Sequence, residues 1–187
     1  IGELVNGKFL KITDRKKEIF KMSNGKYIAP QPIENKLKAS NFIEQVMTTG
    51  EHQKFASALI SPDFNYLHFY ASKHKIHYRD NHELITNELV LKKIHGEIDK
   101  VNKQLSEYEC IKRFKLVCDE WSQETGELSP TLKLKRNVVK KKYAAIIDEI
   151  YGHTPEENGA NPENPDAGNS IPGMITDGLK KLMNSGQ

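Results

Sequence analysis

The stretch FIEQVMTTGEHQKFASALISP, from Phe42 to Pro62, decides the fold class because it places two apolar, β-prone runs next to each other. The runs FIEQVMTTG and KFASALISP have the composition of buried strands. Gly50, Glu51 and His52 lie between them and suit a short turn. We therefore expect the two runs to pair as the central strands of a sheet.

Helical patterns follow on both sides of this strand pair. Pro32 suits the first turn of a helix through IENKLKAS, and the residues from Ser61 to Asp63 can cap a short helix over DFNYLHFYASKHK. The longest helix is predicted from His82 to about Leu105. Its apolar face would be made by Leu84, Ile85, Leu89, Val90, Ile94, Ile98, Val101 and Leu105.

The outer segments complete an α+β pattern. KRFKLVCD alternates as a third core strand, and Asn137 to Tyr151 forms a final helix. The apolar face of that helix would be Val138, Val139, Tyr143, Ile146, Ile147 and Ile150.

A short strand and a hairpin are expected nearer the start of the chain. KFLKIT alternates as a strand, and IFKM and KYIAP form a hairpin around Ser23, Asn24 and Gly25, since Asn-Gly is a strong turn signal. The predicted fold is α+β, with a small central antiparallel or mixed sheet flanked by helices and preceded by a short N-terminal β-hairpin.

Composition sets the domain organisation. The chain has 187 residues, of which 37% are hydrophobic, and no apolar run approaches the roughly 20 residues that cross a bilayer. Residues 1–151 are expected to form one domain. Residues 152–187 are rich in Asn, Pro, Glu and Gly, which predicts a low-complexity, flexible tail. Its last segment, IPGMITDGLKKLMN, suits a short helix. The first residues lack a signal-peptide pattern and begin mid-pattern, which indicates a piece of a longer chain.

Charge and cysteine content narrow the class of protein. The net charge of +3 is unevenly distributed along the chain, because residues 1–150 contain 26 basic and 20 acidic residues. A moderately basic body suits anionic ligands such as phosphates, and it falls short of the dense basic face of a nucleic-acid binder. Cys110 and Cys118 are too few for a disulfide framework. They predict reduced, buried thiols and a cytoplasmic protein.

Lys133, in the segment GELSPTLKLKR, is the strongest candidate for chemistry. The Ser129-Pro130-Thr131 turn would fix the backbone just before it, and Leu132 and Leu134 would anchor a strand by burial. Lys133 and Lys135 would then project to the other side. A lysine on a rigid element can place its charge against a phosphate or carboxylate oxygen. From spacing alone, the solvated face of a strand is the commoner interpretation.

Three other segments allow two interpretations each. The charged run from Asp14 to Lys17 suits a solvated bend or a pivot between domains. The tip from Ser23 to Lys26 suits an ordinary hairpin turn or a loop that approaches a phosphate or thiol closely. A histidine-rich patch comprises His74, His77 and the run from Tyr78 to His82. It suggests a metal site, but solvated residues at a helix end explain the pattern better. No metal site is therefore predicted.

Two of these segments together resemble one family. DRKKEIFKMSNGKYIAPQPIE, from Asp14 to Glu34, resembles the hinge motif of adenylate-forming enzymes, and it looks closest to the long-chain fatty-acid–CoA ligases. PTLKLKR, followed by a basic helix, resembles the final core motif that carries the catalytic lysine of that family. Their order, the roughly hundred-residue gap between them and the leading GELVNGKFLKI agree. The resemblance covers about Ile1 to Tyr151.

The resemblance implies a C-terminal mobile (lid) domain. Such enzymes form an acyl-adenylate from a fatty acid and ATP and then transfer the acyl group to coenzyme A, while the lid rotates between the two half-reactions. Lys133 would be catalytic in adenylation, and Arg15 would bind the nucleotide. The hinge would be Asp14 and Lys17, and the loop of the thioester-forming pose would comprise Lys21, Ser23, Asn24, Gly25 and Lys26.

The implied partners follow from the same resemblance. They are the chain's own N-terminal adenylation domain, ATP or AMP with Mg2+, a fatty acid and coenzyme A, with no nucleic acid. Peripheral membrane association of the full-length enzyme is compatible with this picture. The chain by itself should hold no bound cofactor and should not turn over, because the main active-site domain lies upstream.

Two departures and two alternatives accompany the resemblance. Asp14 stands where the family commonly has glycine before the hinge arginine, and Leu132 replaces the usual glycine before the catalytic lysine. One alternative is a basic α+β module that binds nucleic acid or an acidic partner through Lys133 to Lys142. The other is the lid of an adenylate-forming ligase that hands its acid to a carrier protein.

Overall fold

The computed structural model describes residues 2–5, 9–12 and 18–152. The chain divides into two units, Ile1–Thr154 and Pro155–Gln187, and the second lies outside the described residues. Apart from Gly152, the predicted tail of residues 152–187 with its terminal helix lies outside the described residues, as do the predicted hinge residues Asp14 and Lys17 and the predicted nucleotide ligand Arg15.

Two antiparallel hairpins precede the central sheet, and the sequence predicts the second of them but only one strand of the first. β1 (Gly2–Val5) pairs with β2 (Phe9–Ile12), and β3 (Phe20–Lys21) pairs with β4 (Tyr27–Ile28). The turn of the second hairpin depends on the expected Asn-Gly pair. Asn24 Oδ1 accepts a hydrogen bond of 3.0 Å from the Lys26 amide. Gly25 has a φ of +83°, a left-handed conformation that favours glycine.

The central sheet has the strand order β5-β6-β7. β5 (Ile43–Thr49) and β6 (Ala56–Pro62) are antiparallel, whereas β6 and β7 (Ile111–Leu116) are parallel, so the predicted sheet is confirmed as mixed. All residues of β6 are buried, as its apolar sequence indicates for the middle strand. Gly50 ends β5 with a φ of +152°, and a Cβ there would lie 3.1 Å from the Phe55 carbonyl oxygen.

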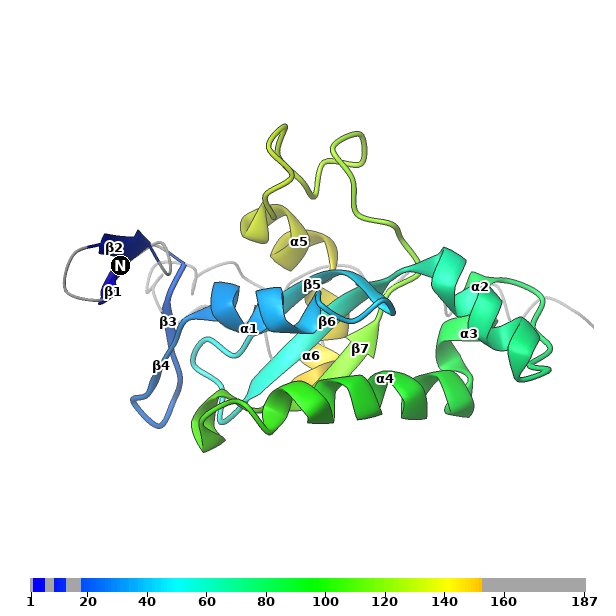
Figure 1. Ribbon diagram of the computed structural model, residues 1–187, viewed down its shortest axis with the longest axis horizontal. Helices are drawn as coiled ribbons and strands as arrows, with labels where there is room; N and C mark the ends of the chain where they lie inside the picture. The colour runs from blue at the N-terminus through cyan, green and yellow to red at the C-terminus, as the bar shows by residue number, and fades with distance from the viewer. Residues whose placement is uncertain (1, 6–8, 13–17, 153–187) are drawn as a thin grey trace, which may run out of the picture. The chain divides into compact units, whose positions relative to one another are not determined.

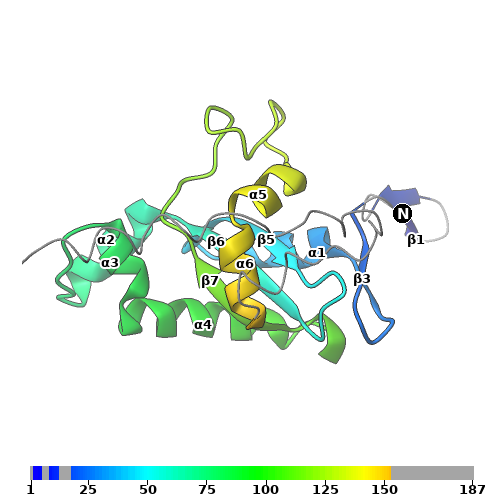
Figure 2. The ribbon, with the colours of Figure 1, turned by 180° about the vertical axis from the view of Figure 1, so that it is seen from behind.

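Helices cover both faces of this sheet (Figures 1 and 2), each face with its own apolar core. Val46 and Ile60 belong to the first core, whereas their neighbours Met47 and Leu59 belong to the second, because successive side chains of a strand point to opposite faces. The first core includes residues of α1 (Pro30–Leu37), α2 (Phe64–Lys73), α3 (Asn81–Thr86) and α4 (Glu88–Asn102). The second includes residues of α5 (Arg136–Lys142) and α6 (Ala144–Tyr151).

The long helix predicted from His82 to Leu105 is wrong in one respect, because the chain breaks it into α3 and α4. Asn87 is extended, with φ −66° and ψ +131°, and its Oδ1 accepts a hydrogen bond of 3.0 Å from the Leu89 amide. Asparagine is a favourable N-cap, so a second helix begins there. Leu89, predicted to be on the apolar face, is 50% exposed.

The final helix is also split, at Tyr143, into α5 and α6. The Tyr143 hydroxyl donates to Asp119 Oδ2 at 2.6 Å and accepts from Trp121 Nε1 at 3.1 Å. These contacts hold the residue at the break against the second core. Val138 is 40% exposed, so its predicted place on the apolar face is wrong, whereas Val139 is buried.

The cysteines and the remaining short element lie around β7. Cys110 and Cys118 flank the strand as free thiols, but both are half-buried and not buried as predicted. The Cys110 thiol donates to the Ser106 carbonyl at 3.4 Å, beside the short 3-10 helix η1 (Glu107–Glu109). None of the described helices is long and apolar enough to cross a membrane.

Candidate functional site

Lys133 lies at the end of a tight turn and not on a strand. The Ser129 carbonyl accepts from the Leu132 amide at 2.8 Å, and the Ser129 amide donates to the Lys133 carbonyl at 2.8 Å. The Ser129 hydroxyl also accepts from the Lys133 amide at 3.1 Å. Leu128 and Leu134 form an isolated antiparallel bridge that closes the turn. Proline in the second position of such a turn is favoured because its φ is preset.

The prediction that Leu132 anchors a strand by burial is wrong. Leu132 is 63% exposed and has a φ of +56°, in the left-handed region. A three-residue hairpin loop needs one residue in that conformation, which glycine adopts at least cost. The sequence pattern missed this because alternating Leu and Lys are typical of a strand, whereas the turn geometry is decided by Ser129 and Pro130.

The Lys133 side chain is exposed at a cavity of about 120 Å³. The cavity is also lined by Glu34 and Asn35 of α1 and by Lys38, which directly follows that helix. Within residues 18–152, the Lys133 ammonium has no hydrogen bond or ion pair. It is therefore a free cation on a backbone held by four local contacts, which suits an anionic ligand brought from outside the described residues.

Arg136, three residues after Lys133, is clamped by carboxylates. Its Nη1 donates to Glu34 Oε1 at 2.8 Å and its Nη2 to Glu34 Oε2 at 2.5 Å, and its Nε lies 3.4 Å from Glu18 Oε2. The side chains of Arg136 and Glu34 are only 14% and 8% exposed. Burial opposes the charge of the guanidinium, but its hydrogen bonds to Glu34 and the charges of Glu34 and Glu18 outweigh burial and raise the pKa of Arg136.

A second polar network holds the other end of the same loop. Lys142 Nζ lies 2.8 Å from Glu127 Oε1 and 3.0 Å from Asp119 Oδ2. Glu127 is fully buried and also accepts from the Thr125 hydroxyl. Burial alone would raise the pKa of Glu127, but the hydrogen bonds from Lys142 and Thr125 outweigh it and lower that pKa. Burial, reinforced by the hydrogen bond to Asp119, raises the pKa of Tyr143 to about 12.

Sequence reasoning missed both networks. Glu34 does carry a signal, because it lies between Ile33 and Leu37 at helical spacing and therefore on the buried side of α1. Nothing in the sequence indicates that its partner is Arg136, because the pair is formed by tertiary packing.

The β3–β4 hairpin presents the other predicted site residues. Lys21, Ser23, Asn24, Gly25 and Lys26 are all exposed. The hairpin is fixed to the turn before β6, because the Ser23 amide donates to the Gln53 carbonyl at 3.0 Å and the His52 amide donates to the Lys21 carbonyl at 2.9 Å.

The hairpin tip borders a cavity of about 490 Å³. Lys26, Lys54 and Lys112 line it together with Phe55 and Tyr108, and the Lys26 ammonium lies 5.6 Å from the centre of the Tyr108 ring. The predicted residues therefore fall into two groups. Figure 1 shows the hairpin and the loop before α5 projecting in opposite directions, and Lys133 and the hairpin tip line different cavities.

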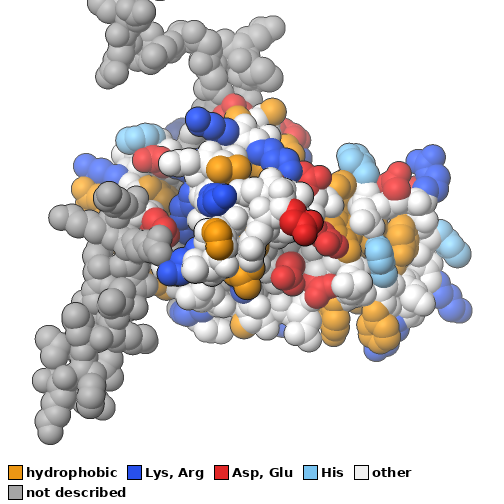
Figure 3. All heavy atoms as spheres, turned by 90° about the horizontal axis from the view of Figure 1, so that it is seen from above, with side chains coloured by type: hydrophobic (Ala, Val, Ile, Leu, Met, Phe, Trp, Pro, Cys, Tyr) orange, Lys and Arg blue, Asp and Glu red, His pale blue; other side chains and the backbone are white. Residues whose placement is uncertain are grey.

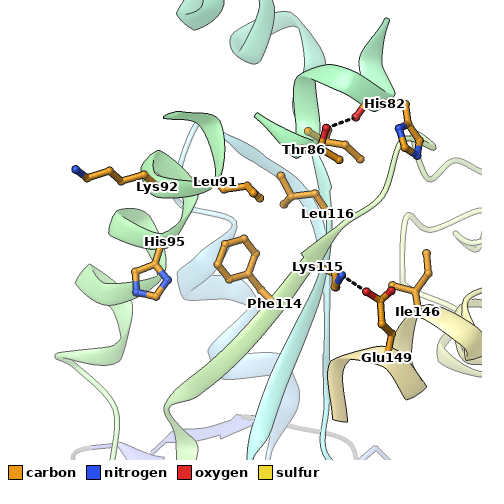
Figure 4. Close-up of a pocket in the computed structure, with 11 residues that line it drawn as sticks. His82, Thr86, Leu91, Lys92, His95, Phe114, Lys115, Leu116, Ile146 and Glu149 are labelled. Atoms are coloured by element: carbon orange, nitrogen blue, oxygen red, sulfur yellow. Dashed lines mark hydrogen bonds and ion pairs between the residues drawn. The ribbon is translucent and has the colours of Figure 1, made fainter. Parts of the chain in front are cut away.

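A further cavity, of about 570 Å³, lies along β7 between α4 and α6 (Figure 4). Phe114, Leu116 and Leu91 give it an apolar floor, and Lys115 pairs with Glu149 at 2.5 Å on its far side. It is roomier than the cavity beside Lys133, but no predicted site residue lines it. The smaller cavity is the better candidate site, because Lys133 and the Arg136–Glu34 pair line it.

The distribution of charged side chains on the described surface is relevant to the alternative in which the chain is a basic module that binds nucleic acid or an acidic partner. Figure 3 shows Lys and Arg side chains interspersed with acidic and hydrophobic ones on the face seen from above, and not gathered into one basic stripe. The histidines lie partly at the end formed by α2 and α3, where the His68 ring stacks on Tyr78 and its Nε2 lies 2.8 Å from Asn81 Oδ1. No cluster of three metal-ligating side chains occurs among the residues described.

Comparison with known proteins identifies the family to which the chain belongs. Residues 17–155 match the AMP-binding enzyme C-terminal domain family. The chain belongs to that family, as its two motifs indicate.

Its relatives include long-chain fatty-acid–CoA ligases. It is 33% identical over 152 residues to long-chain-fatty-acid–CoA ligase FadD15 of Mycobacterium tuberculosis. The matched region covers 81% of this chain and 25% of that protein. It is 36% identical over 154 residues to human long-chain-fatty-acid–CoA ligase 1, covering 81% of this chain and 22% of that protein. The chain thus spans about a quarter of the length of these relatives.

Solved structures share the fold. The adenylation domain of a carboxylate reductase from Mycobacterium chelonae superposes with a TM-score of 0.62 at 24% identity, over 76% of this chain and 20% of that one. The A domain of a carboxylic acid reductase from Segniliparus rugosus, solved with AMP and a carboxylic acid, gives 0.63 at 23% identity, over 76% and 21%.

Proposed function

We propose that this chain is the lid domain of an AMP-forming long-chain fatty-acid–CoA ligase. The whole enzyme would activate a fatty acid with ATP to an acyl-adenylate and transfer the acyl group to coenzyme A. The long-chain ligases among its relatives support the substrate class, and the chain supplies the lid and not the main active-site domain.

The observation that carries this proposal is the exposed ammonium of Lys133, which has no partner within residues 18–152 and lies on a closed turn. In adenylation, negative charge on the fatty-acid carboxylate and on the α-phosphate must be brought together. A preorganised cation offsets that repulsion most in the transition state, because it needs no reorganisation. Arg136 in the same cavity is paired with Glu34 and Glu18, whereas the Lys133 ammonium has no such partner within residues 18–152.

The β3–β4 hairpin suits the second half-reaction. Gly25 has no side chain at the tip, and a Cβ built there would have no neighbour within 4 Å, so the tip is open to a partner. Lys21 and Lys26 lie on either side of the turn, where they suit the phosphates of coenzyme A. Because the hairpin and Lys133 face different cavities, a rotation of the lid would present one group and withdraw the other.

The test uses the intact enzyme that carries this domain, with Lys133→Ala, in pyrophosphate exchange driven by a fatty acid. Losing one preorganised charge should slow adenylation by roughly 10²–10³-fold. Lys141→Ala is the matched control, because Lys141 is an exposed lysine of α5 with no ion pair among the described residues. Equal behaviour of the two variants would remove Lys133 from the active site.

A further inference from the structure

The segment from Glu127 to Lys142 carries Lys133, and two of its basic side chains tie it by ion pairs to the N-terminal part of the domain. Arg136 pairs with Glu34 and Glu18, and Lys140 Nζ lies 2.7 Å from Glu51 Oε2. The contacts of Arg136 and Lys140 differ in burial. The Lys140 and Glu51 side chains are 39% and 47% exposed, whereas the Arg136 and Glu34 side chains are 14% and 8% exposed.

The Arg136 clamp fixes an orientation as well as a contact. Its two parallel hydrogen bonds to Glu34 define the plane of the guanidinium, as a bidentate pair does. Glu34 Oε1 also accepts from the Thr48 amide at 2.6 Å, so the carboxylate is held by β5 as well as by α1. The position of the Arg136 side chain is therefore fixed relative to both α1 and β5, which contribute residues to the first core.

The contact between Arg136 and Glu34 lies next to the turn that holds Lys133, in sequence and in space. Arg136 is the first residue of α5, and the Lys135 amide just before it donates to the Glu127 carbonyl at 2.7 Å. The neighbouring Leu128–Leu134 bridge then connects the two sides of the turn that holds Lys133. A displacement at Arg136 would move the turn as a unit, and a misplacement of about 1 Å can cost roughly 10²-fold in rate.

We propose that Arg136, held by Glu34, is a positioning residue that sets where Lys133 points. Its second carboxylate, Glu18, directly follows Lys17 in the sequence, so the clamp also joins the Lys133 loop to the segment next to the predicted hinge. This inference rests on the proposed function, because it gives Arg136 an effect on adenylation only through Lys133.

The test is a double-mutant cycle in the intact enzyme with Arg136→Lys and Lys133→Ala. Lysine keeps the charge but loses the two-pronged contact. Arg136→Lys should lower kcat of adenylation by about tenfold or more, with KM for ATP and fatty acid within about twofold, because both substrates bind the large domain. Transfer from supplied acyl-adenylate to coenzyme A should be unchanged. In the Lys133→Ala background, Arg136→Lys should have no further effect.

Two further variants keep the result decisive. Glu34→Gln removes the partner charge and should reproduce the Arg136→Lys pattern, and it serves if Arg136→Lys folds poorly. Lys140→Gln breaks the exposed ion pair of the same helix and should leave both half-reactions unchanged.

The inference is overturned if Arg136→Lys and Glu34→Gln leave adenylation intact, if they slow both half-reactions equally, or if they cause the same loss when Lys133 is absent. An unaffected Lys133→Ala single variant has a different meaning, because it refutes the proposed function itself.

Discussion

Arg136 and Glu34 lie 102 residues apart in the sequence, yet their side chains share two hydrogen bonds of 2.8 and 2.5 Å. The pair joins the start of α5 to α1 inside the protein, beside the turn that holds Lys133. We therefore expect the stability of the domain to depend on this pair, and the proposed positioning of Lys133 depends on it as well.

Replacing Arg136 with methionine should destabilise the chain by about 3–5 kcal/mol, because the Glu34 carboxylate would stay buried without its partner. The double variant Arg136→Met, Glu34→Gln should lose much less, since no uncompensated charge is left. Urea unfolding of the two single variants and the double variant measures this coupling. Additive losses would show that the pair does not act as a unit.

Leu132→Gly should leave the chain as stable as before or stabilise it by up to about 1 kcal/mol. Glycine removes the strain of a left-handed leucine, about 1–2 kcal/mol, and this outweighs the greater freedom of glycine in the unfolded chain. Leu132→Val should be destabilising, because a β-branched side chain tolerates this conformation poorly. Denaturant midpoints of the two variants give the comparison, and a clear loss in Leu132→Gly would contradict the assigned turn.

Asn87→Ala should destabilise the chain by about 1 kcal/mol, because α4 loses the side chain that caps its first turn. Asn137→Ala is a suitable control, since Asn137 is an exposed residue of α5 whose side chain makes no hydrogen bond among the described residues. Thermal unfolding by circular dichroism distinguishes the two. Equal melting temperatures would favour the single long helix predicted from the sequence.

The network around Lys142 should make stability depend on acid pH. The hydrogen bonds from Tyr143 and Lys142 lower the pKa of Asp119 below its ordinary 3.8, and the net effect on Glu127 is also a pKa below its ordinary 4.5. Each carboxylate therefore stabilises the fold near neutral pH, and this stabilisation is lost as pH falls below about 4.5.

Lys142→Gln tests that dependence directly. The variant should lose about 1–3 kcal/mol at pH 7, towards the lower end because Lys142 is 40% exposed. The difference from the unmodified chain should shrink near pH 3, where the carboxylates are protonated in both. Lys141→Gln supplies the control. A difference that is the same at pH 3 and pH 7 would show that these carboxylates do not stabilise the fold through their charge.

The sequence predicts the parts of this fold that depend on local pattern. Phe42 to Pro62 forms the expected strand pair, and Asn24 and Gly25 form the expected turn. The helix breaks at Asn87 and Tyr143 are not predicted, because apolar periodicity continues across both. At Asn87 a cap prevails over that periodicity, and at Tyr143 the buried hydroxyl contacts do.

The sequence selects candidate residues for the site but does not predict their geometry. Lys133 is selected by its motif and is indeed exposed, yet Leu132 does not bury, and the turn replaces the strand. No local sequence pattern predicts the contact between Arg136 and Glu34, because it forms only when α1 and α5 pack on the sheet. Pairing between distant charged residues is a property of the fold and not of either segment.

The most direct test of the proposed function is the ratio of the two half-reaction rates in the intact enzyme with Lys133→Ala. Pyrophosphate exchange with fatty acid reports adenylation, and supplied acyl-adenylate with coenzyme A reports thioester formation. We predict that adenylation falls by roughly 10²–10³-fold while thioester formation is retained. If both rates persist, or both fall together, Lys133 is not the lysine that drives adenylation, and the assignment of this loop is wrong.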